Sequence, residues 1–244
     1  MRGCIRQFGK PLFGLLVLVS LSSISIAQQP ATICDTPLTP TTPMTGTFNS
    51  IVVPPGKNCD LANATVNGSI SGSEGSIVSL DGGVHVTGNV SGIDGSFFTI
   101  ATLPPFATTP NVVDGNVNVI GTTGDPGFVA VAICGATIGG NVQVTGTLNS
   151  VAFGGSEPGA ACAAIGGGNH VTKGNVRIEG NTGLFFRIAD NFVGFNLTID
   201  ENTGGATKRV LNNTVGKNLT CTDNDSPFVI GGNAAANLIG QCKP

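Results

Sequence analysis

The sequence contains no tryptophan and no tyrosine, only two histidines, and only 10% charged residues. Soluble proteins carry about 25% charged residues on average. Without Trp and Tyr, the chain lacks the amphipathic rings that most often form sugar-binding platforms. His85 and His170 are the only histidines, and the lack of a G-x-S-x-G elbow argues against a hydrolase triad. No C-x-x-C motif and no Cys/His cluster occurs either, so we expect no metal site and no cofactor.

What the sequence does contain is glycine, at 37 of 244 residues, together with many Val and Ile and 40% hydrophobic residues overall. Glycine weakens helices, and β-branched residues prefer pleated surfaces, so the composition favours an all-β fold. The apolar content is too high for a disordered chain. The length allows one good-sized domain or two small ones.

Residues 1–27 have the composition of an export signal. Three basic residues precede an apolar run from Pro11 to about Ile26, which ends in small residues at Ser25 and Ala27. This order is typical of a signal peptide, and the run is too short and serine-rich for a transmembrane anchor. We expect a secreted, cell-surface or periplasmic protein. Cleavage after Ala27 would remove three of eleven basic residues and leave a net charge near −6, which argues against a nucleic-acid partner.

A short pattern, clearest in "IGGNVQVTG" from Ile138, recurs along the chain. An aliphatic residue lies three before each anchor in most copies, apolar residues lie one and often three after it, and a polar residue lies two after it. Alternation with period two predicts a strand directly after each anchor. The shortest gaps between anchors are 20 to 22 residues, and the anchors are Ser69, Asn89, Asn116, Asn141, Asn175, Asn196 and Asn218.

Repeats of this length indicate stacked coils. We predict a single-stranded right-handed parallel β-helix, a β-solenoid of about eight coils, with a β-sandwich as the alternative. The expected parts are a Pro/Thr-rich N-terminal segment and cap at 28–60, the coils at 61–220, and a C-terminal capping coil at 221–244. A second strand should carry phenylalanines eight to twelve residues past each anchor, and we expect a stacked aromatic core of Phe97, Phe128, Phe153, Phe185 and Phe228.

Six cysteines follow the signal, and an even number in an exported chain indicates disulfides. Six cysteines allow 15 pairings. Residues one coil apart lie at about 5 Å in a solenoid, which is within disulfide range, and neighbouring cysteines are 21 to 28 residues apart. The solenoid therefore favours Cys34–Cys59, Cys134–Cys162 and Cys221–Cys242.

Candidate functional residues lie where the repeat is interrupted. Surplus residues occur in Leu103–Pro110 and in Ser156–Gly168, and insertions in solenoids form loops, often on the binding face. We name Phe106, Glu157 and His170 as binding-loop candidates. Glu179 and Asp200 occupy one column of adjacent coils and are the catalytic candidates, since two carboxylates about 5 Å apart suit a retaining glycosidase. The alternative is an acidic pair exposed to water.

The repeat and the ending "VGKNLTCTDNDSPFVIGGNAAANLIGQC" resemble secreted bacterial β-helix proteins of undefined function. The repeat is more weakly similar to bactofilins, which are polymer-forming β-helix scaffolds without an export signal. The resemblance implies fold and export, and it implies no catalytic residue.

Two functions follow as hypotheses. The first is a secreted non-enzymatic structural or surface protein, such as an adhesin, a matrix component or an envelope-associated scaffold, with a cell-surface glycan or protein as partner. The alternative is a carbohydrate-active β-helix enzyme, either a polysaccharide lyase or a glycoside hydrolase.

Overall fold

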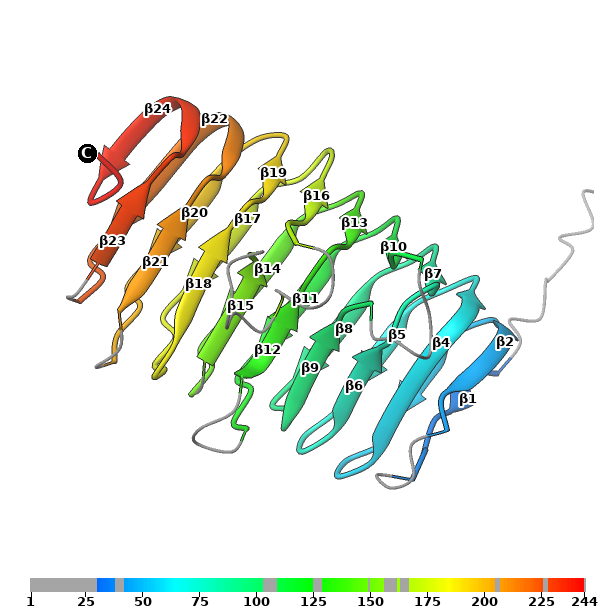
Figure 1. The fold of residues 1–244 in the computed structure, drawn as a ribbon. Helices are drawn as coiled ribbons and strands as arrows, with labels where there is room; N and C mark the ends of the chain where they lie inside the picture. The colour runs from blue at the N-terminus through cyan, green and yellow to red at the C-terminus, as the bar shows by residue number, and fades with distance from the viewer. Residues whose placement is uncertain are drawn as a thin grey trace, which may run out of the picture.

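The chain forms a parallel β-solenoid of about nine turns, in a computed structural model that describes residues 30–37, 42–102, 109–124, 129–148, 150–155, 162, 167–204, 207–225 and 228–243. The coils follow one another along a rod, from β1 at one end to β24 at the other (Figure 1). The described strands pair only in parallel, which excludes the β-sandwich. The predicted solenoid is confirmed, with about nine turns instead of eight.

Each complete coil contributes a strand to each of three faces. Face A consists of two-residue strands: β7 (His85–Val86), β10 (Val112–Val113), β13 (Thr137–Ile138), β16 (His170–Val171) and β19 (Phe192–Val193). At its ends it is continued by parts of β2 (Met44–Phe48), β4 (Asn58–Val66), β22 (Thr214–Thr222) and β24 (Ala234–Gly240).

Face B holds the strand predicted after each anchor. Its members are β1 (Thr32–Ile33), β3 (Ile51–Val53), β5 (Ile70–Gly72), β8 (Val90–Ile93), β11 (Val117–Ile120), β14 (Val142–Thr145), β17 (Val176–Glu179), β20 (Leu197–Asp200), and the second halves of β22 and β24.

Face C holds the second predicted strand of each coil. It starts with the first part of β4 and continues with β6 (Ile77–Leu80), β9 (Phe97–Ile100), β12 (Val129–Ile133), β15 (Ser150–Gly154), β18 (Phe186–Ala189), β21 (Lys208–Leu211) and β23 (Phe228–Gly231).

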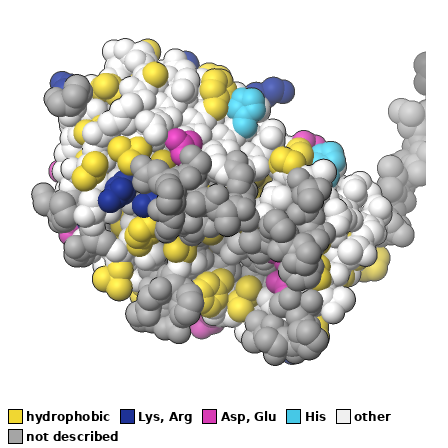
Figure 2. Space-filling view, viewed as in Figure 1, with side chains coloured by type: hydrophobic (Ala, Val, Ile, Leu, Met, Phe, Trp, Pro, Cys, Tyr) yellow, Lys and Arg dark blue, Asp and Glu magenta, His cyan; other side chains and the backbone are white. Residues whose placement is uncertain are grey.

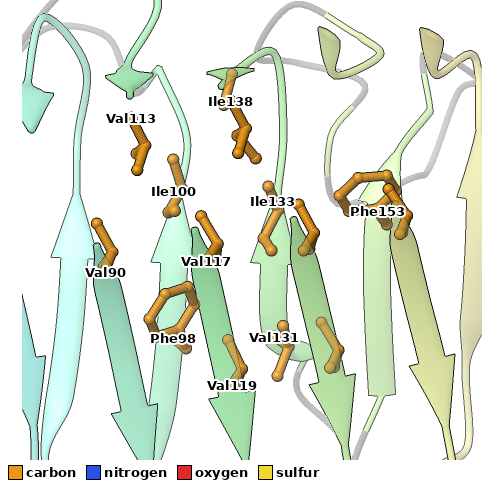
Figure 3. Packing of buried hydrophobic residues seen from close by; sticks show 14 of the residues in the cluster. Val90, Phe98, Ile100, Val113, Val117, Val119, Val131, Ile133, Ile138 and Phe153 are labelled. Atoms are coloured by element: carbon orange, nitrogen blue, oxygen red, sulfur yellow. The ribbon is translucent and has the colours of Figure 1, made fainter. Parts of the chain in front are cut away.

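The core lies inside the coils, where the apolar member of each alternating pair points. Val117 and Val119 from face B are fully buried, and they face Phe98 and Val131 from face C (Figure 3). Because each coil is too thin to enclose these side chains alone, the core exists only when neighbouring coils cover one another.

The phenylalanines do not form the predicted aromatic stack. Phe98, Phe153 and Phe186 are buried, but Phe98 is in register with Val131 and Phe153 with Ile188. Rings alternate with aliphatic side chains because the interior must be filled at close packing without gaps. Phe128 lies outside the described residues.

The corners between faces are held by ladders of side-chain amides, of which the sequence predicted one. At the corner between faces A and B, each anchor donates a hydrogen bond to the anchor of the preceding coil. The Asn116 backbone N–H donates to Asn89 Oδ1 at 2.8 Å, and the Asn141 N–H donates to Asn116 Oδ1 at 2.8 Å. This ladder is exposed to solvent. Its members with such bonds are Asn89, Asn116, Asn141, Asn175, Asn196 and Asn218.

Glycine precedes most anchors for a steric reason. A Cβ at Gly115 would lie 2.4 Å from the carbonyl oxygen of Gly88, and one at Gly140 would lie 2.7 Å from that of Gly115. At these two positions the coil below leaves no room for a side chain. The repeated Gly-Asn pair therefore reflects the distance between coils.

Two further ladders are buried, and both were missed by the sequence analysis. Between faces C and A, the Asn169 N–H donates to Asn191 Oδ1 at 2.9 Å, and the Asn191 N–H donates to Asn213 Oδ1 at 3.2 Å. Between faces B and C, Asn181, Asn202 and Asn224 are linked in the same way. In each buried ladder the amide nitrogen also caps a strand carbonyl, as Asn191 Nδ2 does for Phe153 at 2.8 Å.

The six cysteines lie at disulfide distance in the predicted pairs. Their Cα atoms are 5.3 Å apart in Cys34–Cys59, 5.3 Å apart in Cys134–Cys162 and 5.1 Å apart in Cys221–Cys242. The first and third pairs join the outermost coils to their neighbours, where a solenoid has unpaired strand edges.

We predict that peptide mapping under non-reducing conditions recovers these three linkages and no other. Reduction should lower the free energy of unfolding by about 3 kcal/mol for each closed loop of this size. A linkage between the first and last coils would contradict the solenoid, since those coils are at opposite ends of the rod.

The buried ladders should contribute more to stability than the exposed one. Asn191→Ala leaves the Asn169 N–H buried without a partner and removes the amide donor to the Phe153 carbonyl, which should cost about 3 kcal/mol. The matched control is Asn141→Ala on the exposed ladder, where water replaces the lost bonds and the cost should stay near 1 kcal/mol. Urea unfolding followed by far-UV circular dichroism measures both, and equal losses would refute the distinction.

Candidate functional site

The outward side of face B carries a column of polar residues at the position two after each anchor. The column is in register from coil to coil, because Asn118 pairs with Ser91 and Gln143, and Gln143 pairs with Arg177. These side chains point to solvent because their strand neighbours Val117 and Val119 fill the core. The column runs through Ser91, Asn118, Gln143, Arg177, Thr198 and Thr220.

The first half of this column forms one side of a hollow, which we call the amide groove. Its volume is about 400 Å³, and the exposed asparagine ladder forms the opposite side. It is lined by Asn89, Ser91, Asn116, Val117, Asn118, Asn141 and Gln143, which carry no formal charge. The groove is thus a polar, neutral depression that extends over three successive coils.

Asn118 has a buried amide oxygen without a hydrogen-bond partner. A buried unpaired polar atom costs stability, and native proteins rarely contain one without a water or ligand to satisfy it.

Glu179 and Asp200 lie farther along the same face, in register with one another as predicted. Glu179 forms an ion pair with Arg177, whose Nη2 lies 2.6 Å from Glu179 Oε1. Asp200 accepts a hydrogen bond from the Thr222 hydroxyl. Each carboxylate is therefore bonded to a different neighbour.

The three loop candidates do not join this site. Phe106 and Glu157, with most of both insertions, lie outside the described residues. His170 lies in β16 on face A, where its exposed ring packs edge-on against Phe192 at 4.6 Å between centroids. The structure therefore places His170 on a different face from Glu179 and Asp200.

A buried acidic cluster on the outer side of face C was also missed from the sequence. Asp60 and Asp81 are nearly inaccessible, and Asn58 Nδ2 donates to Asp60 Oδ2 at 3.1 Å. Burial raises the pKa of Asp60, and burial together with the charge of Asp60 raises the pKa of Asp81. Asp60 is in register with Ser79, so the two aspartates do not share a column and the repeat does not mark them in the sequence.

Near the opposite end of the rod, Lys208 occupies an inward position of face C. Its Nζ donates to the Gly204 carbonyl at 2.8 Å and pairs with Asp225, and the hydrogen bond from Lys208 lowers the pKa of Asp225. Its side chain is buried between the coil of Phe186 and the coil of Phe228. This ion pair closes the core near the last coil, so we assign it a structural role.

Charged groups are few and scattered on the face shown in Figure 2. Within the described ranges, no three His, Cys, Asp or Glu residues are grouped so that they could hold a metal ion. In the same ranges no helix is long and apolar enough to cross a membrane.

Comparison of the chain with protein-family models, curated proteins and solved structures finds no match in any of the three. The function must therefore be argued from the residues of this chain.

The buried aspartates predict a specific dependence of stability on pH. Because their folded pKa lies above the unfolded value of 3.8, folding favours the protonated form. Stability should therefore be lost as the pH rises from about 4 through the raised pKa values. Asp81→Asn cannot ionise, so it should be more stable than the wild type at pH 7 and close to it at pH 3.5.

Urea midpoints at the two pH values measure this difference. Asp223→Asn is the matched control, because Asp223 is exposed and its positive φ of 52° suits asparagine. The control should follow the wild type. An Asp81→Asn variant that gains nothing at pH 7 would contradict the effect of burial.

Proposed function

We propose that the protein is an exported, non-enzymatic structural or surface protein, a rigid scaffold of the adhesin, matrix or envelope-associated kind. The observation that carries this proposal is the use of asparagine amides as coil-to-coil bonds at all three corners. Ladders of this kind fix the coils against bending and fraying. A scaffold needs a fixed shape and a stable fold, and these ladders contribute to both.

Export is supported by the cysteines and by the predicted signal at residues 1–27. Disulfides form and persist in oxidising compartments and are rare in the cytosol. Three cysteine pairs at disulfide distance, two of them in the outermost coils, fit a protein that works outside the cytoplasm. We place it outside the cell, on its surface or in the periplasm.

The alternative function is a carbohydrate-active enzyme, and one observation favours it. Glu179 and Asp200 are register neighbours on an open face, and a retaining glycosidase requires two carboxyl groups only about 5 to 5.5 Å apart. The ion pair of Glu179 with Arg177 and the hydrogen bond from Thr222 to Asp200 speak against it. Both carboxylates are already engaged by other groups of the protein.

The two functions are separated by an assay of product formation. Incubation with a panel of neutral and acidic polysaccharides should release no reducing sugar and no unsaturated product. Release that disappears in the double variant Glu179→Gln with Asp200→Asn would overturn the scaffold proposal. Release that persists in the double variant would point to a contaminant, because these are the only carboxylates registered side by side among the described residues of face B.

A further inference from the structure

We propose that the amide groove binds an uncharged polysaccharide chain, laid along face B parallel to the rod. The groove spans three coils and about 400 Å³, and amide or hydroxyl side chains provide nearly all of its lining. A ligand that fits it must offer hydrogen-bond donors and acceptors at regular intervals and must carry no net charge. A linear chain of neutral sugars has these properties.

The donors of the groove come from the asparagine ladder. Asn116 Nδ2 uses one hydrogen to reach Asn89 Oδ1 at 3.1 Å, and Asn141 Nδ2 reaches Asn116 Oδ1 at 3.3 Å. Each amide nitrogen carries two hydrogens, so one donor per coil remains for a ligand. These donors repeat at the coil spacing of about 4.8 Å, which is similar to the length of one sugar unit in an extended chain.

The acceptor comes from the opposite side of the groove. The exposed Gln143 amide can accept as well as donate, and a sugar hydroxyl can both donate to it and accept from the ladder. Gln143 extends this side by one coil, in register with Asn118. The lining of the groove therefore offers both donors and acceptors to a neutral ligand.

Charge and backbone geometry argue against other classes of partner. A nucleic acid requires basic residues along its path, and the groove lining contains none. The nearest cation in the column, Arg177, is held by Glu179. A peptide strand would add to a sheet edge, but the backbone of β11 is paired on both sides, with β8 and β14.

This proposal rests on the non-enzymatic function proposed above, since a hydrolase would degrade the bound chain. Affinity electrophoresis of the purified protein tests it, in gels that contain hydroxyethyl cellulose, glucomannan, xyloglucan or polygalacturonate. At least one neutral polymer should retard the protein, and polygalacturonate should not. Retardation by polygalacturonate alone, or by no polymer, would overturn the groove proposal and leave the scaffold function intact.

The double variant Asn118→Ala with Gln143→Ala should raise the apparent dissociation constant at least about tenfold, because it removes two hydrogen-bonding groups. The matched control is Thr198→Ala with Thr220→Ala, in the same column but outside the groove, and it should stay within about twofold of the wild type. Both variants spare the ladders, and far-UV circular dichroism checks that both are folded. A groove variant that binds as well as the control would refute the assignment.

Assay of the same polymers for released sugar keeps the two proposals distinct. Binding without release supports both of them. Release abolished by Glu179→Gln with Asp200→Asn would refute the non-enzymatic function, whatever the outcome at the groove.

Discussion

The structure depends on how a chain can turn three times per coil without leaving buried backbone groups unpaired. Strand residues are satisfied by the coils above and below, but corner residues cannot be, because their amides and carbonyls point in several directions. At two corners the buried asparagines provide the missing hydrogen-bond partners. The Asn202 side-chain oxygen, for example, accepts from the Asn181 N–H, and its amide nitrogen donates to the Ile178 carbonyl. A residue with one acceptor and two donors on a short stem is well suited to such a position.

A second feature of these corners is a left-handed backbone residue directly before most of the buried asparagines. Glu201 at φ 51° precedes Asn202, and Asp190 at φ 59° precedes Asn191. Elsewhere this position is glycine, as at Gly180 before Asn181. The strain is tolerated because the ladder hydrogen bonds fix the corner on both sides, and short polar side chains reduce it.

These requirements explain which features the sequence could predict. Every anchor is followed by the same strand, so the A–B corner and face B keep a constant offset, and their columns could be aligned by eye. The B–C ladder keeps a constant offset too, because Asn181, Asn202 and Asn224 each lie six residues after an anchor, and this column could have been aligned from the sequence. The C–A ladder follows face C after insertions of different length, so Asn169 and Asn191 do not share one distance from the anchors before them. Its members are marked by pairs such as Asp190-Asn191, whose first residue varies because several residue types accept a positive φ.

The candidate site also combines features that the sequence predicts with features that it does not. The polar column was predictable, because alternation alone places Asn118 and Gln143 outward. The state of Glu179 and Asp200 was not, since register gives proximity but cannot show that Arg177 and Thr222 bond to them. The buried position of Asp60 and Asp81 was equally hidden, because Asp60 occupies an outward position of β4 and Asp81 directly follows β6, yet both are shielded from water.

The exposed ladder differs from the buried ladders in direction as well as in environment. Its oxygens accept from the next coil toward the C-terminus, whereas the buried oxygens accept from the preceding coil. The buried amides use both nitrogen hydrogens inside the protein, one on the ladder and one on a strand carbonyl. The exposed amides of Asn116 and Asn141 have no strand carbonyl to cap, so one hydrogen of each stays available. The stack thus needs all of the bonding capacity of its inner asparagines but only part of that of its outer ones, and the remainder faces the groove beside Asn118.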